Sequence, residues 1–150
     1  MNHESCYICS RVEAWRRGEN AHFIHEFEHS IMVLGEHQFH PGYSLLLLKE
    51  HRRELHELAP EAQAGLFREL MTATRALVET FHPWKMNHAS YGNAQPHVHW
   101  HLFPRYDTLP DHQSHPWLHA AEFDRHIVGV EEAQRLIARI RAALPAEPGP

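Results

Sequence analysis

The sequence predicts an α+β fold, in which an antiparallel sheet of about five strands packs with a long central helix, an N-terminal helix and a C-terminal helix. Two groups of short apolar segments lie on either side of a single long amphipathic pattern. Strand-like and helix-like segments do not alternate, as they would in a parallel sheet of βαβ units. The chain has 150 residues, 43% of them hydrophobic and 22% charged, which suits one globular domain. We therefore expect a single domain over residues 1–144, followed by a flexible tail at 145–150.

The first group of segments predicts the N-terminal helix and three strands. Residues 6–18 are typical of a short helix that ends at a glycine. Two short strands follow at 22–27 and 30–34, joined by a tight link. Residues 40–43 form a turn, and 44–49 read as a strand that is buried on both faces because it is almost wholly aliphatic.

The central helix is predicted over residues 60–81. Its apolar residues recur at spacings of three and four: Leu66, Leu70, Ala73, Leu77 and Phe81. Pro60 is tolerated in a first helical turn, and Pro83 stands just beyond the predicted end. Two more strands are expected at 84–91 and 97–106, joined by a loop at 92–96.

The last third of the chain predicts an irregular segment and the C-terminal helix. Residues 107–120 are rich in proline, histidine and aspartate, so they are expected to be irregular, and His112, His115 and His119 within them are expected to face solvent. The closing helix is marked by Ala133, Leu136, Ile137, Ile140 and Leu144.

Composition excludes two classes of partner. The formal net charge is −5 with histidine neutral, and most of the 17 histidines are neutral at pH 7 because their ordinary pKa is about 6.5. The chain therefore lacks the basic surface that nucleic-acid binding requires. No apolar run is long enough to span a membrane, and the N-terminus lacks the layout of a secretory signal. We expect a cytoplasmic protein, and this charge balance still allows small phosphorylated ligands, because a few local donors can bind them.

Alternating histidines carry the clearest chemical signal. Because successive side chains on a strand point to opposite faces, His97, His99 and His101 line one face, and Val98, Trp100 and Leu102 bury the other. A neutral imidazole that attacks phosphorus forms a phosphoramidate intermediate, and a neighbouring imidazole can donate to the phosphate or protonate the leaving group. Backbone amides of the loop at 92–94 could stabilise the same charge. Two other interpretations stay open. The histidines could simply be solvent-exposed on one face of the sheet, or all three could surround a catalytic metal.

Residues 97–103 fit the pattern His–apolar–His–apolar–His–apolar–apolar, so the chain resembles the histidine triad (HIT) family. Within that family it is similar to bacterial HIT-like hydrolases that resemble diadenosine tetraphosphate hydrolases. Supporting similarities lie at Cys6–Cys9, at 41–43, at 47–51 and at Pro104-Arg105. The sequence departs from the family pattern in several places. The loop before the triad is one residue shorter than in the commonest members, and residues 94–96 lack the Ser or Thr often found there. Two further departures are single positions. Gly35 stands where an aspartate usually holds the nucleotide ribose, and Tyr43 stands where histidine is common.

The resemblance implies a homodimeric enzyme that hydrolyses or transfers a nucleotide at its α-phosphate through a covalent nucleotidyl-histidine. His99 falls at the position of the nucleophile, and His101 at the position that contacts the scissile phosphate. Trp117 falls where it could close over a ligand. The candidate substrate-binding residues are Asn87, Gly92, Asn93, Gln95 and Arg105. A catalytically silent, zinc-stabilised nucleotide-binding dimer remains an alternative, as does a metal-dependent hydrolase.

Cys6 and Cys9 are the only two cysteines, and they are spaced Cys-x-x-Cys. A redox pair would follow a strand in a βαβ unit, and a structural disulfide does not suit a reducing cytosol. A zinc site needs two more ligands. By resemblance to zinc-bearing HIT proteins these are His51 and His97, which together with the cysteines would hold a structural zinc.

Overall fold

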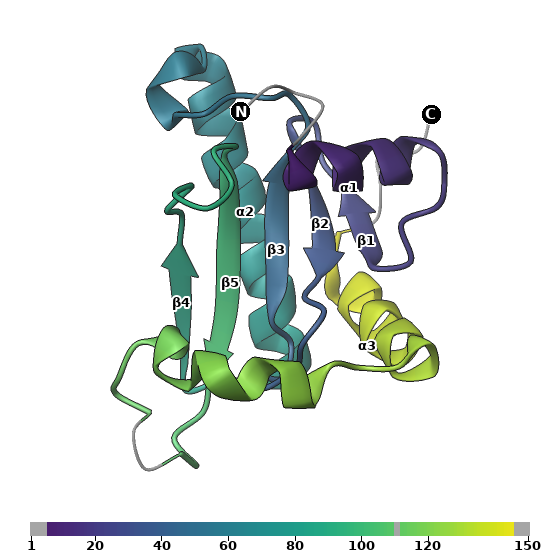
Figure 1. Ribbon diagram of the computed structural model, residues 1–150, viewed down its shortest axis with the longest axis vertical. Coiled ribbons are helices and arrows are strands. Elements are labelled where there is room, and N and C mark those ends of the chain that lie inside the picture. Colours follow the sequence, from purple (N-terminus) through teal and green to yellow (C-terminus); the bar gives the residue numbers. More distant parts are fainter. Residues whose placement is uncertain (1–5, 110–111, 146–150) are drawn as a thin grey trace.

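The computed structural model describes residues 6–109 and 112–145. It contains a five-stranded sheet in the order β1-β2-β3-β5-β4, in which every neighbouring pair is antiparallel (Figure 1). The strands are β1 Phe23–Glu26, β2 Ser30–Leu34, β3 Ser44–Leu48, β4 Lys85–Ala89 and β5 His99–Arg105. The predicted α+β class and antiparallel sheet are confirmed.

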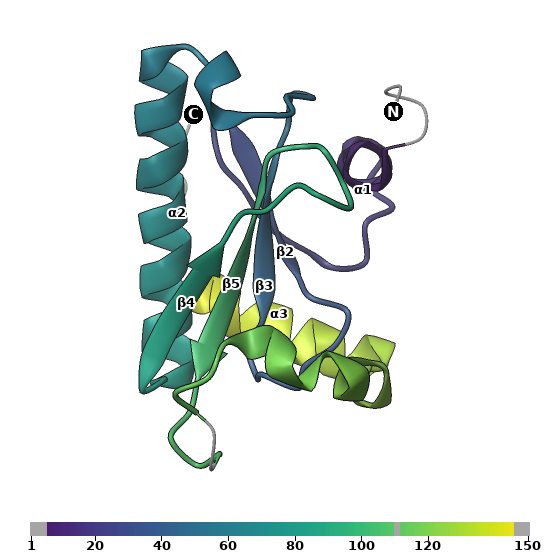
Figure 2. The same cartoon turned by 60° about the vertical axis from the view of Figure 1, so that its left-hand side comes forward.

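Helices cover both faces of this sheet. The long helix α2, Pro60–Phe81, and the closing helix α3, Val130–Ala143, pack on one face. The short helix α1, Tyr7–Arg16, lies against the other face, as Figure 2 shows. Because strand side chains alternate, β2 contributes Met32 and Leu34 to the α2 side and Ile31 and Val33 to the α1 side. Apolar side chains on both faces explain why β2 is buried throughout.

The amphipathic pattern predicted α2 at its observed bounds. Pro60 stands at the first helical position, where a missing N–H costs nothing. His82 ends the helix in the left-handed conformation, at φ 47°, and its N–H donates to the carbonyl of Val78. Among the side chains that face the sheet, Leu70, Ala73 and Leu77 are almost fully buried.

Strand β5 begins at His99, two residues later than expected. The His97 N–H donates to the carbonyl of Gln95, and the Val98 N–H donates to the carbonyl of Arg52, so these residues belong to the preceding bend. The alternation nevertheless holds, because Val98 and Leu102 lie in the core beneath α2. The histidines therefore lie on the opposite face, which α1 covers only in part.

The expectation for residues 107–120 is wrong in its second half. A pair of 3₁₀ turns, η3, occupies Pro116–His126 with a break at His119, and a short η2 spans Leu55–Glu57. Aromatic contacts with the sheet hold η3, and periodicity does not reveal them. Among them, the rings of Trp117 and Phe103 lie 4.9 Å apart. In Figure 1, η3 is the green segment that crosses the lower end of the sheet, opposite the end that α1 covers.

Apart from Pro145, the predicted tail at 145–150 lies outside the described residues. Among the residues that the structure describes, none of the helices combines the length and hydrophobicity that a bilayer crossing requires.

Candidate functional site

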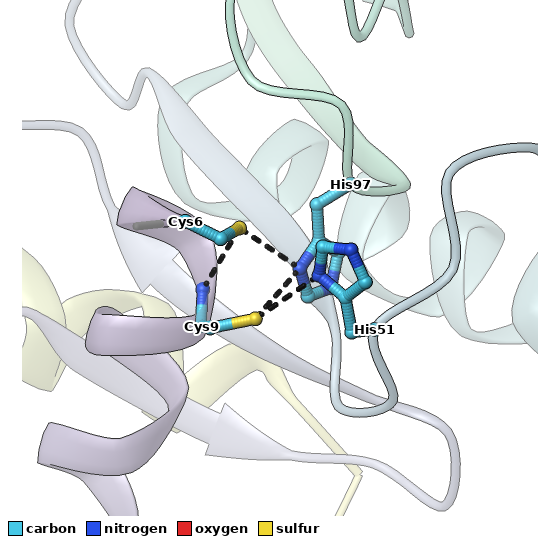
Figure 3. Close-up of side chains that lie close together, drawn as sticks. All are labelled: Cys6, Cys9, His51 and His97. Carbon is cyan, nitrogen blue, oxygen red and sulfur yellow. Dashed lines mark hydrogen bonds between the residues drawn. The ribbon is translucent and has the colours of Figure 1, made fainter. Parts of the chain in front are cut away.

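Two cysteines and two histidines meet where α1 approaches the start of β5 (Figure 3). Cys6 is the N-cap of α1, and its Sγ accepts a hydrogen bond from the Cys9 backbone N–H at 3.4 Å. His51 follows β3, and His97 lies in the bend before β5. The four candidate ligand atoms lie within 4.8 Å of one another, and only His51 is not fully buried. The fold thus brings together all four residues predicted as metal ligands.

Three sulfur–nitrogen distances within this cluster are close to those around a tetrahedral zinc. The Cys9 Sγ lies 3.1 Å from the His51 Nδ1 and 3.4 Å from the His97 Nδ1, and the Cys6 Sγ lies 3.5 Å from the same His97 nitrogen. Zinc bonds of about 2.3 Å to sulfur and about 2.0 Å to nitrogen separate such ligands by roughly 3.5 Å.

The hydrogen bonding of His97 also suits a metal ligand. Its Nε2 lies 2.8 Å from the Leu48 carbonyl, which can only accept, so Nε2 carries the proton. The lone pair of Nδ1 therefore faces the two sulfurs, and the hydrogen bond to the carbonyl fixes the ring, as is usual for an imidazole that binds a metal. Burial and the neighbouring Cys6 raise the pKa of the Cys9 thiol to about 12, and a bound cation would reverse this preference for the neutral form.

His99 presents the opposite nitrogen. Its Nδ1 lies 2.6 Å from the His97 carbonyl and donates to it, so the unprotonated nitrogen is Nε2. His99 is 7% exposed, and it lines a cavity. An imidazole in this state is a nucleophile whose orientation the main chain fixes.

His101 follows on the same face, with its ring centroid 5.0 Å from that of His99. Its Nδ1 lies 2.7 Å from the hydroxyl of Tyr43, which comes from the turn before β3. Burial, with a smaller contribution from His99, lowers the pKa of His101 to about 4, so the ring is neutral near pH 7.

The cavity around His99 and His101 has a volume of about 630 Å³. It is lined by Tyr91, Gly92, Asn93, Ala94, Gln95, His99, His101, His115 and Trp117. Five predicted site residues thus share one cavity, and Trp117 contributes a wall, with its ring 5.2 Å from that of His101. His115 is exposed as expected, yet it also lines the cavity. Sequence reasoning missed this role because only the η3 turns bring His115 back to β5.

Arg105 and Asn87 lie outside this lining. Arg105 is 1% exposed, and it donates to the Asn87 side-chain oxygen at 2.9 Å. The same guanidinium donates to the carbonyls of Ser114 at 2.7 Å and His112 at 3.2 Å. It therefore ties β5 and β4 to the segment that leads into η3.

A smaller apolar slot of about 180 Å³ lies between α1 and the sheet. It is lined by Tyr7, Ile8, Arg11, Val33, Leu34, Glu36, His37, Tyr43, Leu45 and Leu47. In the strand register Leu45 pairs with His101 and Leu47 with His99, so the slot lies beside the histidine cavity. At its rim, the Glu36 carboxylate accepts hydrogen bonds from the Tyr7 hydroxyl at 2.7 Å and Arg11 at 3.0 Å.

Solved structures share this architecture. A histidine triad protein from Sinorhizobium meliloti has a TM-score of 0.73 at 21% identity, covering 95% of this chain and 100% of its own. A zinc-bound histidine triad family protein from Mycobacterium smegmatis has a TM-score of 0.64 at 27% identity, covering 95% of this chain and 94% of its own. Diadenosine triphosphate hydrolase from Plasmodium falciparum has a TM-score of 0.57 at 16% identity, covering 81% and 75%. A search of curated proteins finds no match.

The family model of the HIT domain matches residues 16–108, which is more than half of the chain. This match includes the three alternating histidines, and the observed sheet and helices are those of the histidine triad structures above. The chain therefore belongs to the HIT family.

Proposed function

We propose that the protein is a HIT-type nucleotide hydrolase or nucleotidyltransferase that acts at an α-phosphate through a covalent nucleotidyl-histidine. The single observation that carries the proposal is the state of His99. Its Nδ1 donates to the His97 carbonyl at 2.6 Å, which leaves the Nε2 lone pair for the cavity. A solved neighbour of the same fold is a diadenosine triphosphate hydrolase, which supports a nucleotide substrate.

The two adjoining hollows suit the two parts of such a substrate. The apolar slot beside β3 would take the nucleoside, and the larger cavity would take the phosphates. The His99 Nε2 attacks phosphorus, so a P–N bond forms while the bond to the leaving group breaks. The leaving group departs with a proton from a neighbouring acid. Water or another acceptor then cleaves the P–N bond, and the imidazole is restored.

Gly92, Asn93 and Gln95 line the phosphate cavity and are the proposed substrate contacts, together with His101. We also propose that Asn87 and Arg105 contribute to substrate binding indirectly. Their hydrogen bonds hold the segment that leads into η3, which forms one wall of the cavity. Trp117 would close over the leaving group.

Zinc would be held by Cys6, Cys9, His51 and His97, and with four protein ligands it would be structural. Its role would be to tie α1 to the start of β5, next to His99. A reducing compartment such as the cytoplasm keeps both thiols available as ligands, which is the location we propose.

We also propose a homodimer. Strand β4 lies at the end of the strand order, so one of its edges has no partner strand among the described residues. Pairing of two β4 edges would join two sheets into one. Trp84 and Tyr91, which flank β4, are 50% and 69% exposed and would gain a partner surface.

The proposed chemistry is tested with His99→Gln. Turnover of diadenosine polyphosphates and adenosine phosphoramidate should fall by about 10⁴-fold or more, because the nucleophile is lost. The exposed His56, on the α2 side, provides a matched control, and His56→Gln should keep full activity. Mass spectrometry of quenched wild-type protein should show one nucleotidyl adduct on His99. Wild-type-like turnover by His99→Gln would contradict the mechanism.

Nucleotide binding and chelator sensitivity separate the two alternatives. Tight binding of AMP or GMP without turnover of any substrate would favour a catalytically silent dimer. A metal-dependent hydrolase would need His99 and His101 to share a metal with His97, whose Nδ1 instead faces the two cysteines. Its signature would be loss of activity in chelator, and full recovery on metal addition, with no change in stability.

A further inference from the structure

We propose that Tyr43 is a positioning residue that fixes the tautomer of His101, and that Gly35 is required because it leaves room for the Tyr43 ring. The catalytic meaning of this pair rests on the proposed function. The contact itself can be tested without any substrate.

The hydroxyl of Tyr43 and the Nδ1 of His101 are 2.7 Å apart. Either atom could be the donor, since phenol and neutral imidazole each hold one proton. Burial raises the pKa of Tyr43, so the phenol keeps its proton. In the described part of the chain, His101 Nδ1 is the one hydrogen-bond partner found for this hydroxyl. The hydroxyl therefore donates, Nδ1 accepts, and the proton of the neutral imidazole resides on Nε2.

Packing holds the phenol ring in this position. The ring stacks on Phe103 with centroids 4.3 Å apart and planes within 7° of parallel. His37 stacks on it as well, at 4.5 Å. The side chain is 6% exposed, so moving the ring would open a cavity in a packed layer.

Gly35 also lies against the ring of Tyr43. A Cβ atom at position 35 would lie 2.2 Å from the Cδ1 and 2.5 Å from the Cε1 of Tyr43, far inside van der Waals contact. The Gly35 N–H also donates to the Tyr43 carbonyl at 2.9 Å, so neither backbone can move away without losing a bond. Even alanine at position 35 would displace the ring from His101. The departures at positions 35 and 43 are thus one matched pair.

As a consequence, the two imidazoles in the cavity present different groups to a substrate. His99 offers an unprotonated Nε2, and His101 offers a protonated Nε2. A phosphoryl group gains charge on its oxygens as it is attacked, and a preset neutral donor beside the nucleophile stabilises that charge. In the other tautomer the His101 Nε2 would present a lone pair to those oxygens and repel them.

The experiment compares two variants with two matched controls. Tyr43→Phe removes the hydroxyl and keeps the ring, and Gly35→Ala displaces the ring. Tyr106→Phe removes another hydroxyl, which donates to the Pro41 carbonyl at 2.7 Å. Gly129→Ala adds a methyl group where no atom lies within 4 Å, at an ordinary negative φ.

Imidazole ¹⁵N chemical shifts report the tautomer directly. Wild type and both controls should show His101 protonated at Nε2, and both variants should show a mixture of the two tautomers. A wild-type His101 protonated at Nδ1, or an unchanged tautomer in Tyr43→Phe, would overturn the proposal. Tyr43→Phe keeps the buried ring and adds no atom to the packed layer, so the test does not depend on the stability of Gly35→Ala.

Kinetics then test the role of the tautomer. We expect kcat to fall about tenfold to a hundredfold in Tyr43→Phe while the Kd for AMP changes less than about threefold, because the lost contact acts on the transition state. An altered tautomer with unchanged kcat would refute the positioning role. If wild-type protein turned over no nucleotide, the proposed function would fail, and the ¹⁵N shifts would still decide whether Tyr43 fixes His101.

Discussion

His97 and His99 lie two residues apart on the same side of one segment, yet they present opposite ring nitrogens. His97 donates from Nε2 to the Leu48 carbonyl and turns Nδ1 toward two sulfurs. His99 donates from Nδ1 to the His97 carbonyl and turns Nε2 toward a cavity. In each case a main-chain carbonyl takes one nitrogen and leaves the other for chemistry. The difference teaches that the acceptor next to the ring, more than the residue type, decides what a histidine can do.

The two regions also differ in what holds them together. The cysteine and histidine cluster joins α1, the segment after β3 and the bend before β5 through a few close side chains. The cavity is held by aromatic stacking and by the buried Arg105. If this contrast is correct, damage to the first region should be measured mainly as lost stability, and damage to the second as lost catalysis.

The largest expected effect is the loss of zinc ligation. Cys9→Ser should lower the free energy of unfolding of zinc-loaded protein by about 4 kcal/mol, and the melting temperature by about 10 °C, because a ligand that binds only the folded state is lost. Urea titration of wild type, Cys9→Ser and His99→Gln measures the contrast, and His99→Gln should lose less than about 1 kcal/mol. Equal stability of Cys9→Ser and wild type in the presence of zinc would remove the structural role of the cluster.

An intermediate effect is expected for Arg105→Met. The change should cost about 3 kcal/mol, since it removes a buried cation and leaves three oxygen acceptors without their donor. Amide hydrogen exchange should rise across 112–126 and stay unchanged in α1. Arg135 is 69% exposed and pairs with Glu132, which is also exposed, so Arg135→Met should cost less than about 0.5 kcal/mol. A stable Arg105→Met protein that has lost only substrate affinity would mean that Arg105 acts purely as a ligand contact.

The smallest effect concerns pH. Burial lowers the pKa of His37, His40 and His101 to about 4 in each case. The unfolded chain has the ordinary value of about 6.5, so it binds more protons than the folded chain between these values. Stability should therefore be complete above pH 7 and fall as the pH drops from about 6.5 to 4, by about 2 kcal/mol after solvent screening. Urea titrations at several pH values measure the slope, and His40→Gln should reduce it. A slope that is the same in both proteins would contradict the contribution of His40.

The strands and the main helices could be predicted from the sequence because their patterns are local. Spacings of three and four along 60–81 define α2, and the alternation around His99 places the histidines on one face. The η3 turns could not be predicted, since no periodic pattern marks them. They depend on contacts such as Trp117 against Phe103, between residues that only the folded sheet brings together.

The candidate site also contains residues that could be predicted from the sequence and residues that could not. The Cys-x-x-Cys spacing indicated only half of the metal cluster, and the family resemblance implied His51 and His97, which the fold brings next to Cys6 and Cys9. Asn87 and Arg105 show where that reasoning ends. A polar side chain near a histidine motif suggests a ligand contact, whereas Arg105 is buried and donates to the half-buried Asn87. The opposite case is His115, which lines the cavity although nothing in its sequence neighbourhood marks it.

The clash between a side chain at position 35 and the ring of Tyr43 also constrains the history of this cavity. The tyrosine ring at position 43 leaves no room for a side chain at position 35. A lineage that began with a larger residue at position 35 must have lost that side chain before, or together with, the arrival of tyrosine. Reconstructed ancestors should therefore never combine tyrosine at position 43 with a residue larger than glycine at position 35.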